Sequence, residues 1–214
     1  MNELWTAVIP VKRLGLAKSR LRGAVPAARH QDLALAMLAD TAAAVLACAE
    51  IGELVVVTDD PEAMRITREL GARPVADEPD AGLNAAFRFG ADVVAGTGRN
   101  RVALAGDLPA LRPAELGEVL RSVRGRAFVA DAAGTGTVLL GVRQGSDLDP
   151  RFGIGSAAAH AGSGATALTG DWPGLRQDVD TAADLRTVMA LGAGPRTCGL
   201  LRDLGLISSC LPAA

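Results

Sequence analysis

The sequence has very few aromatic residues: it contains no tyrosine, four phenylalanines and two tryptophans. Proteins that bind single-stranded nucleic acid without sequence preference stack the bases on such rings. The formal net charge is −2, so the chain as a whole also lacks the excess positive charge that a polyphosphate backbone attracts. Both absences argue against a nucleic-acid-binding protein.

Cysteine and histidine are also sparse, with three and two residues among 214. The cysteines are scattered, and none has the Cys-x-x-Cys or Cys/His spacing of a zinc site. Two histidines offer no Ser-His-Asp or Cys-His arrangement for nucleophilic catalysis. The first residues contain no cationic segment followed by a long apolar one, so we expect no signal peptide and a cytoplasmic, reducing setting.

Hydrophobic residues are plentiful, at 49% of the chain, and they occur in short segments of two alternating periods. Apolar runs rich in β-branched residues predict buried strands, whereas apolar residues three or four positions apart predict helices. The predicted strands are 5–11, 54–59, 73–77, 101–107, 127–131 and 136–142. The predicted helices are 31–49, 61–70, 83–95, 181–192 and one that begins at Pro113.

The long apolar segment 33–47 contains Asp40 and has helical periodicity, so it predicts a core helix and not a membrane span. The length predicts a single domain over residues 1–214, with residues 192–214 as a C-terminal extension. Strand and helix alternate through the first half of the chain. This alternation predicts a three-layer α/β protein with a mostly parallel sheet.

Ligands of such sheets bind beyond the carboxyl ends of the strands. The polar residues that end the predicted strands are Lys12, Asp59, Asp107 and Asp131. We therefore expect one cation and three acids along one edge of the sheet. Asp59 and Asp131 also suit turns, and we interpret these two as structural.

A cationic loop follows the first predicted strand, with Gly15 among Lys12, Arg13, Lys18 and Arg20. Four like charges this close either extend into water or surround an anion such as a polyphosphate. The position after the first strand of a doubly wound sheet favours phosphate binding. Neither a Gly-x-x-x-x-Gly-Lys-Ser/Thr loop nor a Gly-x-Gly-x-x-Gly motif is present, so the site belongs to neither of those classes.

Two acidic segments suit a metal ion. Asp107 ends a predicted strand, and the following Leu-Pro pair holds it in place, although a turn or a helix cap would also explain it. Asp178 and Asp180 lie two residues apart and point the same way if the segment is extended. Asp180 is adjacent to Thr181, a predicted helix cap, and is explained by it. Asp107 and Asp178 are the predicted ligands of a Mg²⁺ that also binds substrate phosphates.

Two glycine-rich segments, residues 134–137 and 151–160, permit close approach of the backbone to a small anion. Ser156 begins a predicted short helix whose first turn favours an anion. The Thr137 and Ser156 hydroxyl groups are neutral donors that suit a carboxylate or a phosphate, with turn and cap formation as the alternative. His160 is either a ligand contact or a histidine packed structurally on a helix face.

The available chemistry consists of cations, carboxylates and glycines, without a convincing general base. This set suits phosphoryl or nucleotidyl transfer, in which catalysis depends on positioning and on neutralising charge. A nucleophile that is itself a phosphate is ionised at neutral pH and needs no base.

Seven motifs, in this order, resemble the guanylyltransferases of coenzyme F-420 biosynthesis over roughly residues 7–192. They are IPVKRLGLAKSRL (9–21), TDD (58–60), GLNAAF (82–87), GDLPAL (106–111), GTGT (134–137), RFGIGSAAAH (151–160) and DVDTAADL (178–185). The resemblance implies a nucleotide-diphospho-sugar-transferase-like, Rossmann-like fold. It also implies GTP and Mg²⁺, and attack of a small phosphorylated three-carbon acid on the α-phosphorus with loss of pyrophosphate.

The resemblance assigns roles by motif position. The implied metal ligands are Asp107 and Asp178, and the implied acid-binding residues are Thr137, Gly153 and Ser156. The implied catalytic cations that neutralise the triphosphate of the bound nucleotide are Lys12, Lys18 and Arg20, and the implied nucleoside contact is Asn84.

One position bears on the choice of acid. Val138 follows the threonine of the GTGT motif, where archaeal-type members of the family carry asparagine. The segment resembles the actinobacterial form, which favours phosphoenolpyruvate and leaves 2-phospho-L-lactate open.

Two other functions fit parts of the sequence. A non-catalytic nucleotide-binding regulatory module could keep the cationic loop and lose one of the two acids, whereas this chain has both. A nucleotide-sugar transferase, suggested by the fold alone, would need a glycine-rich first loop that is absent here. Residues beyond Pro195 match no family motif, and we interpret them as a helix and an apolar tail used in packing or in a homodimer.

Overall fold

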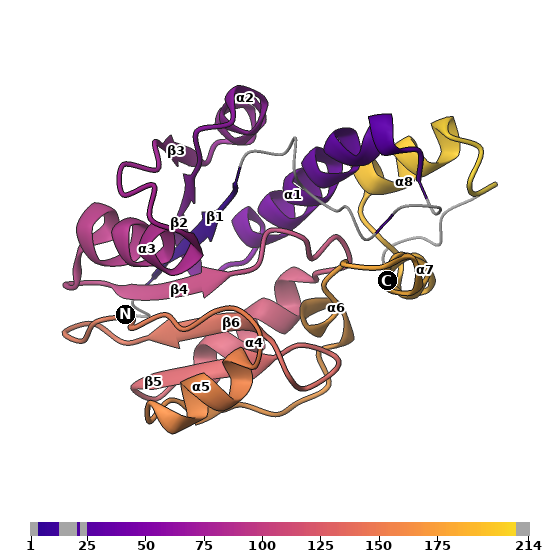
Figure 1. Cartoon of the computed structure of the whole chain (residues 1–214). Coiled ribbons are helices and arrows are strands. Elements are labelled where there is room, and N and C mark those ends of the chain that lie inside the picture. The colour runs from indigo at the N-terminus through magenta and orange to yellow at the C-terminus, as the bar shows by residue number, and fades with distance from the viewer. Residues whose placement is uncertain (1–3, 13–20, 22–24, 209–214) are drawn as a thin grey trace.

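Short strands of valine, isoleucine and leucine form the centre of the molecule, with helices on both sides (Figure 1). The structure is a computed structural model that describes residues 4–12, 21 and 25–208. In this part of the chain one seven-stranded sheet has the order β3-β2-β1-β4-β6-β5-β7. Its strands are β1 (Trp5–Pro10), β2 (Ile51–Val57), β3 (Arg73–Val75), β4 (Asn100–Leu104), β5 (Arg126–Ala130), β6 (Thr137–Val142) and β7 (Thr166–Ala167).

The sheet is parallel except for one strand. β1 is parallel to β2 and β4, β2 to β3, and β5 to β7, whereas β6 is antiparallel to both of its neighbours, β4 and β5. The predicted α/β class with a mostly parallel sheet is confirmed. Because β6 alone runs the other way, its first residue lies at the edge where the other strands end.

The helices are α1 (His30–Leu46), α2 (Pro61–Glu69), α3 (Leu83–Arg88), α4 (Pro113–Ser122), α5 (Ser156–Gly162), α6 (Pro173–Arg176), α7 (Ala182–Leu191) and α8 (Pro195–Asp203). A short 3₁₀ helix (Ala27–Arg29) precedes α1, and α3 continues as a π-helical segment (Phe89–Gly96). The predicted helix 83–95 is therefore two helical forms in succession. Across residues 4–12, 21 and 25–208, no helix has both the length and the apolar character needed to cross a bilayer.

Alternate residues of the central strands face opposite sides of the sheet, as a period of two requires. Ile9 of β1 packs in a core with α1, α2 and α4, whereas its neighbour Val8 packs in a second core with α3 and α5. Both residues have no exposed surface. Continuous apolar strands such as β1 are thus explained by burial on both faces.

Two helix starts follow the predicted capping chemistry. Asp60 precedes Pro61, and its carboxylate accepts the backbone N–H groups of Glu62 and Ala63 at 3.0 Å. At the start of α7, Thr181 and Asp184 form a capping box, with the Thr181 N–H donating to Asp184 at 2.7 Å. These local interactions account for both boundaries.

Residues Pro195–Asp203 form α8, which lies beside α1 (Figure 1). Asp40 of α1 accepts the backbone N–H groups of Arg196 and Thr197 at 3.1 and 2.8 Å, so a buried carboxylate stabilises the start of α8. Burial raises the pKa of Asp40. The packing interpretation of this region is confirmed for residues 195–203. Residues 209–214 lie outside the described part of the chain, and the homodimer stays a prediction.

Candidate active site

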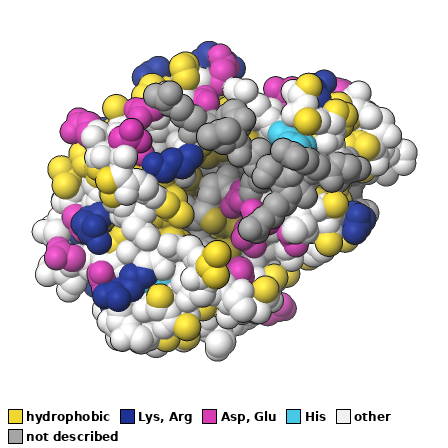
Figure 2. Space-filling model, in the orientation of Figure 1, with side chains coloured by type: hydrophobic (Ala, Val, Ile, Leu, Met, Phe, Trp, Pro, Cys, Tyr) yellow, Lys and Arg dark blue, Asp and Glu magenta, His cyan; other side chains and the backbone are white. Residues whose placement is uncertain are grey.

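A cavity of about 950 Å³ lies where β1 and β4 end. This is also the point at which the strand order changes direction, because β2 and β3 extend the sheet on one side of β1 and β4 lies on the other. The face in Figure 2 is hollowed near its middle, where hydrophobic and acidic side chains gather. The cavity is lined by Gly153, the glycine predicted to bind the acid, and by eight polar residues: Lys12, Asp107, Asp131, Thr135, Thr137, Ser156, Asp178 and Asp180.

The structure therefore brings together residues that are distant in sequence. The predicted metal ligands and the predicted acid-binding residues all line the same cavity. Thr137 is there because it is the first residue of the antiparallel strand β6. Sequence periodicity did not predict the direction of this strand.

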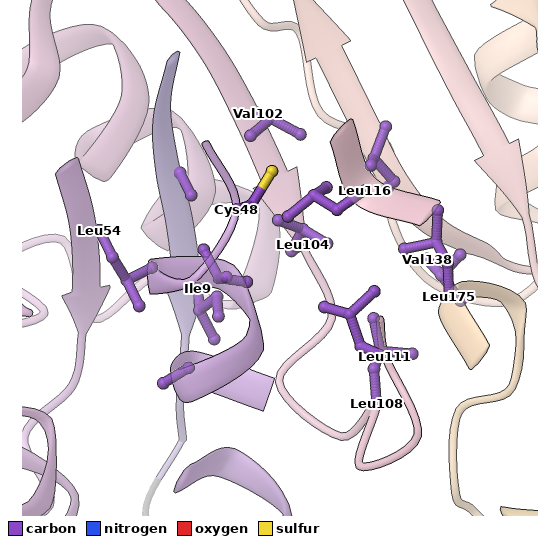
Figure 3. Packing of buried hydrophobic residues seen from close by; sticks show 14 of the residues in the cluster. Ile9, Cys48, Leu54, Val102, Leu104, Leu108, Leu111, Leu116, Val138 and Leu175 are labelled. Atoms are coloured by element: carbon purple, nitrogen blue, oxygen red, sulfur yellow. The ribbon is translucent and has the colours of Figure 1, made fainter. Parts of the chain in front are cut away.

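The loop that carries Asp107 is anchored in the core. Leu108 and Leu111 are almost fully buried and point into the cluster beneath the sheet (Figure 3). The Thr41 hydroxyl of α1 accepts the backbone N–H of Leu108 at 3.0 Å and itself donates to the Met37 carbonyl at 2.8 Å. A helix hydroxyl thus fixes the peptide that follows Asp107.

We expect Thr41→Val to lower thermal stability and kcat/KM together. The substitution conserves volume but leaves the buried Leu108 N–H without its acceptor, which costs about 1–3 kcal/mol. Thr187→Val is the matched control, because the Thr187 hydroxyl makes the same contact to the carbonyl four residues earlier but is exposed on α7. Thermal denaturation and an activity assay measure both effects. A Thr41 variant that behaves like the Thr187 variant would contradict this anchoring role.

The segment before Asp178 is fixed from two sides. Glu115 of α4 accepts the N–H groups of Gly174 and Leu175 at 3.1 and 2.7 Å. The Arg176 guanidinium donates to the Asp131 carbonyl at 2.8 Å, at the end of β5. A Cβ atom at Gly174 would lie 2.2 Å from a backbone oxygen, so only glycine permits this approach. These contacts hold the segment that carries Asp178, which lines the same cavity as Asp107.

Asp178 has the most perturbed carboxylate of the site. Burial, followed by the negative charges of Asp107, Asp180 and Asp131, raises its pKa to about 7. The acids are therefore close enough to repel one another. In residues 4–12, 21 and 25–208, no three Asp, Glu, His or Cys side chains form a metal cluster, so a cation would need further ligands from water or substrate.

The structural interpretations of Asp59 and Asp131 are confirmed. The two oxygens of Asp131 accept the N–H groups of Thr135 and Gly136, each at 2.9 Å, and so shape the GTGT segment. Asp59 accepts the N–H of Asp77 at 3.1 Å. Asp131 contributes negative charge to the cavity as well as this support.

Lys12 is the described cation of the predicted phosphate loop. Its Nζ lies 3.1 Å from Asp77, and about half of its side chain is exposed beside the cavity. Lys18 and Arg20 lie outside the described residues, so their predicted role in neutralising the triphosphate stays a prediction.

Asn84 occupies a different position from the other predicted residues. Its amide nitrogen donates to the Phe152 carbonyl at 3.0 Å, and its oxygen accepts the Phe152 N–H at 2.7 Å. In this geometry Asn84 supports the glycine loop, whereas the nucleoside contact implied by the resemblance stays a prediction.

The start of α5 differs from expectation. The Ser156 N–H donates to the Gly153 carbonyl at 3.1 Å, and the Ala157 N–H donates to the Thr135 carbonyl at 3.2 Å. Because these two amides are used within the protein, the predicted anion site at the first turn is wrong for them. The Ser156 side chain still lines the cavity.

His160 of α5 is fully buried beneath the cavity. Its Nδ1 lies 2.9 Å from the Thr137 hydroxyl, and its Nε2 lies 2.9 Å from the Arg151 backbone nitrogen. The interpretation of His160 as a structurally packed histidine is confirmed by its burial. The ring also contacts Thr137, a predicted acid-binding residue. The only sequence signal was its place at the end of the RFGIGSAAAH motif.

The sequence matches the family described as "Guanylyl transferase CofC like" over residues 5–211. The chain belongs to this family. It is 56% identical to phosphoenolpyruvate guanylyltransferase of Salinispora arenicola, covering 93% of this chain and 95% of the relative. It is 51% identical to the protein of that name in Streptomyces coelicolor, covering 94% and 97%. The family resemblance found in the sequence is confirmed, and the chain is a nucleotidyltransferase enzyme of the guanylyltransferase type.

Solved structures confirm the fold. A protein from Desulfovibrio desulfuricans assigned as a nucleotide-diphospho-sugar transferase superposes with a TM-score of 0.71 at 18% identity, over 94% of this chain and 95% of its own. A nucleotidyl transferase from Methanothermobacter gives a TM-score of 0.54 at 18% identity, over 88% and 97%. The predicted nucleotide-diphospho-sugar-transferase-like fold is therefore correct.

Proposed function

We propose that this enzyme transfers the guanylyl group of GTP to phosphoenolpyruvate and releases pyrophosphate. The product is enolpyruvoyl-2-diphospho-5′-guanosine, for coenzyme F-420 biosynthesis. The proposal rests on relatives that are named phosphoenolpyruvate guanylyltransferase and are 46–56% identical to this chain over about nine-tenths of its length. The cavity supports it, since carboxylates, a lysine and neutral hydroxyl donors surround one space.

The reaction needs positioning and charge neutralisation. A phosphate oxygen of the acid forms a bond to the α-phosphorus of GTP, and the bond from that phosphorus to the oxygen bridging to the β-phosphorus breaks. The electron pair of the broken bond leaves with pyrophosphate. Because the attacking phosphate is already ionised, no residue has to remove a proton, which fits the absence of a cavity-lining histidine or cysteine among the described residues.

Asp107 and Asp178 are the residues that fit a Mg²⁺. Two carboxylates that repel each other, in a partly buried site with a raised Asp178 pKa, are a suitable donor set for a hard cation. The ion would neutralise triphosphate charge when bound. Two protein ligands leave coordination positions for water and phosphate oxygens, as Mg²⁺ prefers.

The remaining residues have complementary roles in the proposal. Lys12 at the end of β1 neutralises a phosphate of the nucleotide, and Lys18 and Arg20 of the same loop share that task. Thr137, Gly153 and Ser156 bind the acid through uncharged groups. Neutral donors suit this part of the cavity, because they bind an anion without adding a second positive charge beside the metal.

The choice between acids does not depend on direct contact with Val138. That side chain is 1% exposed and packs in the core cluster with Leu108 and Leu175 (Figure 3). It cannot touch a ligand in the cavity. The relatives, and not this residue, therefore favour phosphoenolpyruvate over 2-phospho-L-lactate.

A pyrophosphate-release assay with GTP and Mg²⁺ tests the proposal. We expect kcat/KM with phosphoenolpyruvate to exceed that with 2-phospho-L-lactate by at least about tenfold, the scale on which a shaped pocket separates similar substrates. Pyrophosphate is the readout because it does not depend on the lifetime of the other product. The reverse preference would assign 2-phospho-L-lactate as the substrate. Tight GTP binding without turnover with either acid would indicate the regulatory module.

A further inference from the structure

One imidazole ring connects two separate segments of the acid-binding part of the cavity. His160 contacts the Thr137 hydroxyl of β6 through Nδ1, and through Nε2 it contacts the Arg151 N–H, two residues before Gly153; both distances are 2.9 Å. The ring has no exposed surface, so it cannot itself touch a ligand in the cavity. Its influence on a ligand must pass through Thr137 or through the loop.

The surroundings determine the charge of this ring. Burial, followed by the positive charge of Arg126, lowers the pKa of His160 to about 4. Arg151 also lowers this pKa, whereas the negative charge of Asp149 and a hydrogen bond with the Ser156 backbone raise it. At neutral pH the ring is therefore uncharged and carries one proton.

The contacts determine which nitrogen holds that proton. A backbone N–H can only donate, so Nε2 must accept the hydrogen bond from Arg151. The proton of the neutral ring is then on Nδ1, facing Thr137. In this tautomer the imidazole is the donor and the Thr137 oxygen is the acceptor.

Because His160 donates to the Thr137 oxygen, the hydrogen of the Thr137 hydroxyl is left for another acceptor. A threonine hydroxyl has one hydrogen, and here that hydrogen is not used towards His160. Within the described part of the chain, the hydroxyl has no hydrogen-bond partner besides His160. Thr137 lines the cavity, so the hydrogen is available to a ligand there.

We propose that His160 is a positioning residue that commits the Thr137 hydroxyl to donate into the cavity, towards an anionic oxygen of the acid substrate. The inference rests on the proposed function, because it concerns how that acid is held. A hydroxyl that instead donated to the ring would present only lone pairs to the anion. A hydrogen bond to a charged group changes affinity by about 10- to 100-fold, so the direction is important for binding.

The packing holds the ring in this orientation. Phe128 and Phe152 have ring centroids 5.7 and 5.2 Å from that of His160. Phe152 is held by its two backbone hydrogen bonds to Asn84 and by stacking on Phe87 at 4.2 Å. The donor direction is therefore set before the substrate binds, and no group has to reorient.

A double-mutant cycle tests the coupling. We expect Thr137→Val and His160→Gln each to raise KM for the acid about tenfold or more, with little change in KM for GTP. Under the proposal, the effect of His160 on the acid passes through the Thr137 hydroxyl and not through the Arg151 contact, so the double variant should be no worse than Thr137→Val. His30→Gln is the matched control, since His30 is also buried but binds the Val25 carbonyl away from the cavity lining.

A purely structural role for His160 predicts different results. The two losses would multiply in the double variant, and KM for GTP would rise as well, and either result would overturn the proposal. The ring tautomer provides a measurement that requires no substitution at His160. In ¹⁵N NMR of the wild-type protein we expect Nδ1–H, with the His30→Gln variant assigning the remaining signal, because the chain has two histidines. An Nε2–H ring would refute the proposal even if the His160 variant does not fold.

The outcomes separate this proposal from the proposed function. Wild-type protein that releases no pyrophosphate with any small phosphorylated acid would contradict the proposed function. The ring tautomer would then still test whether His160 donates to the Thr137 hydroxyl. An active wild type with multiplying losses would contradict only the role of His160.

Discussion

Replacement of Asp107 by asparagine is expected to lower kcat/KM for pyrophosphate release by about a thousandfold. A metal that neutralises triphosphate charge contributes several kcal/mol, and about 4 kcal/mol corresponds to three powers of ten in rate. Asparagine keeps the shape of the side chain, and Thr41, Leu108 and Leu111 still anchor the loop. The protein should therefore remain folded, with Mg²⁺ affinity reduced.

Steady-state kinetics over a range of Mg²⁺ concentrations, with circular dichroism for folding, measure these effects. Asp203→Asn is the control, because it removes the same charge from the exposed last residue of α8, away from the cavity lining. A folded Asp107 variant with the kcat/KM of the control would remove Asp107 from the metal site.

Asp178→Asn is expected to reduce activity to a similar extent and yet to stabilise the metal-free protein above pH 7. The folded-state pKa of Asp178 is raised to about 7 from 3.8, so folding takes up a proton between these pH values. The stability that Asp178 contributes is complete below pH 3.8 and is lost as the pH rises through about 7. Asparagine removes this loss.

We expect the variant to be more stable than the wild type at pH 8 by roughly 1–2 kcal/mol, after allowance for solvent screening of this partly exposed group. At pH 4 the difference in stability between the variant and the wild type should disappear.

Mg²⁺ should stabilise the wild type by about 2.7 kcal/mol at one hundred times its dissociation constant, and the variant by much less. Thermal denaturation with and without Mg²⁺ measures both. A metal-free variant no more stable than the wild type at pH 8 would show that Asp178 is not destabilised by burial and its acidic neighbours.

Local patterns were sufficient for most of the elements. The runs of buried β-branched residues predicted six strands, and the Asp60-Pro61 and Thr181-Asp184 pairs predicted helix starts that the hydrogen bonds confirm. Strand β7 and helix α6 were not predicted, because two and four residues are too short for a periodic pattern. Both depend on partners distant in sequence, the edge of β5 and the carboxylate of Glu115.

Residue types predicted most members of the site, but not their connections. An aspartate after a strand, or a threonine between glycines, is visible in one segment of sequence. The contacts that hold these residues are not, since Thr41 reaches Leu108 across 67 positions and Asn84 reaches Phe152 across 68. The sequence could suggest a nucleoside contact for Asn84, and only the fold reveals its two bonds to the loop.

By itself the sequence determined the α/β class, the enzyme family and the chemical groups available, because strand burial, helix capping and ordered motifs are properties of neighbouring residues. The tertiary structure decided which groups meet. The reversed direction of β6 places Thr137 at the edge where the parallel strands end, and the burial of His160 leaves it one proton to donate. Convergence and protonation depend on surroundings contributed by distant segments, and no local pattern in the chain encodes them.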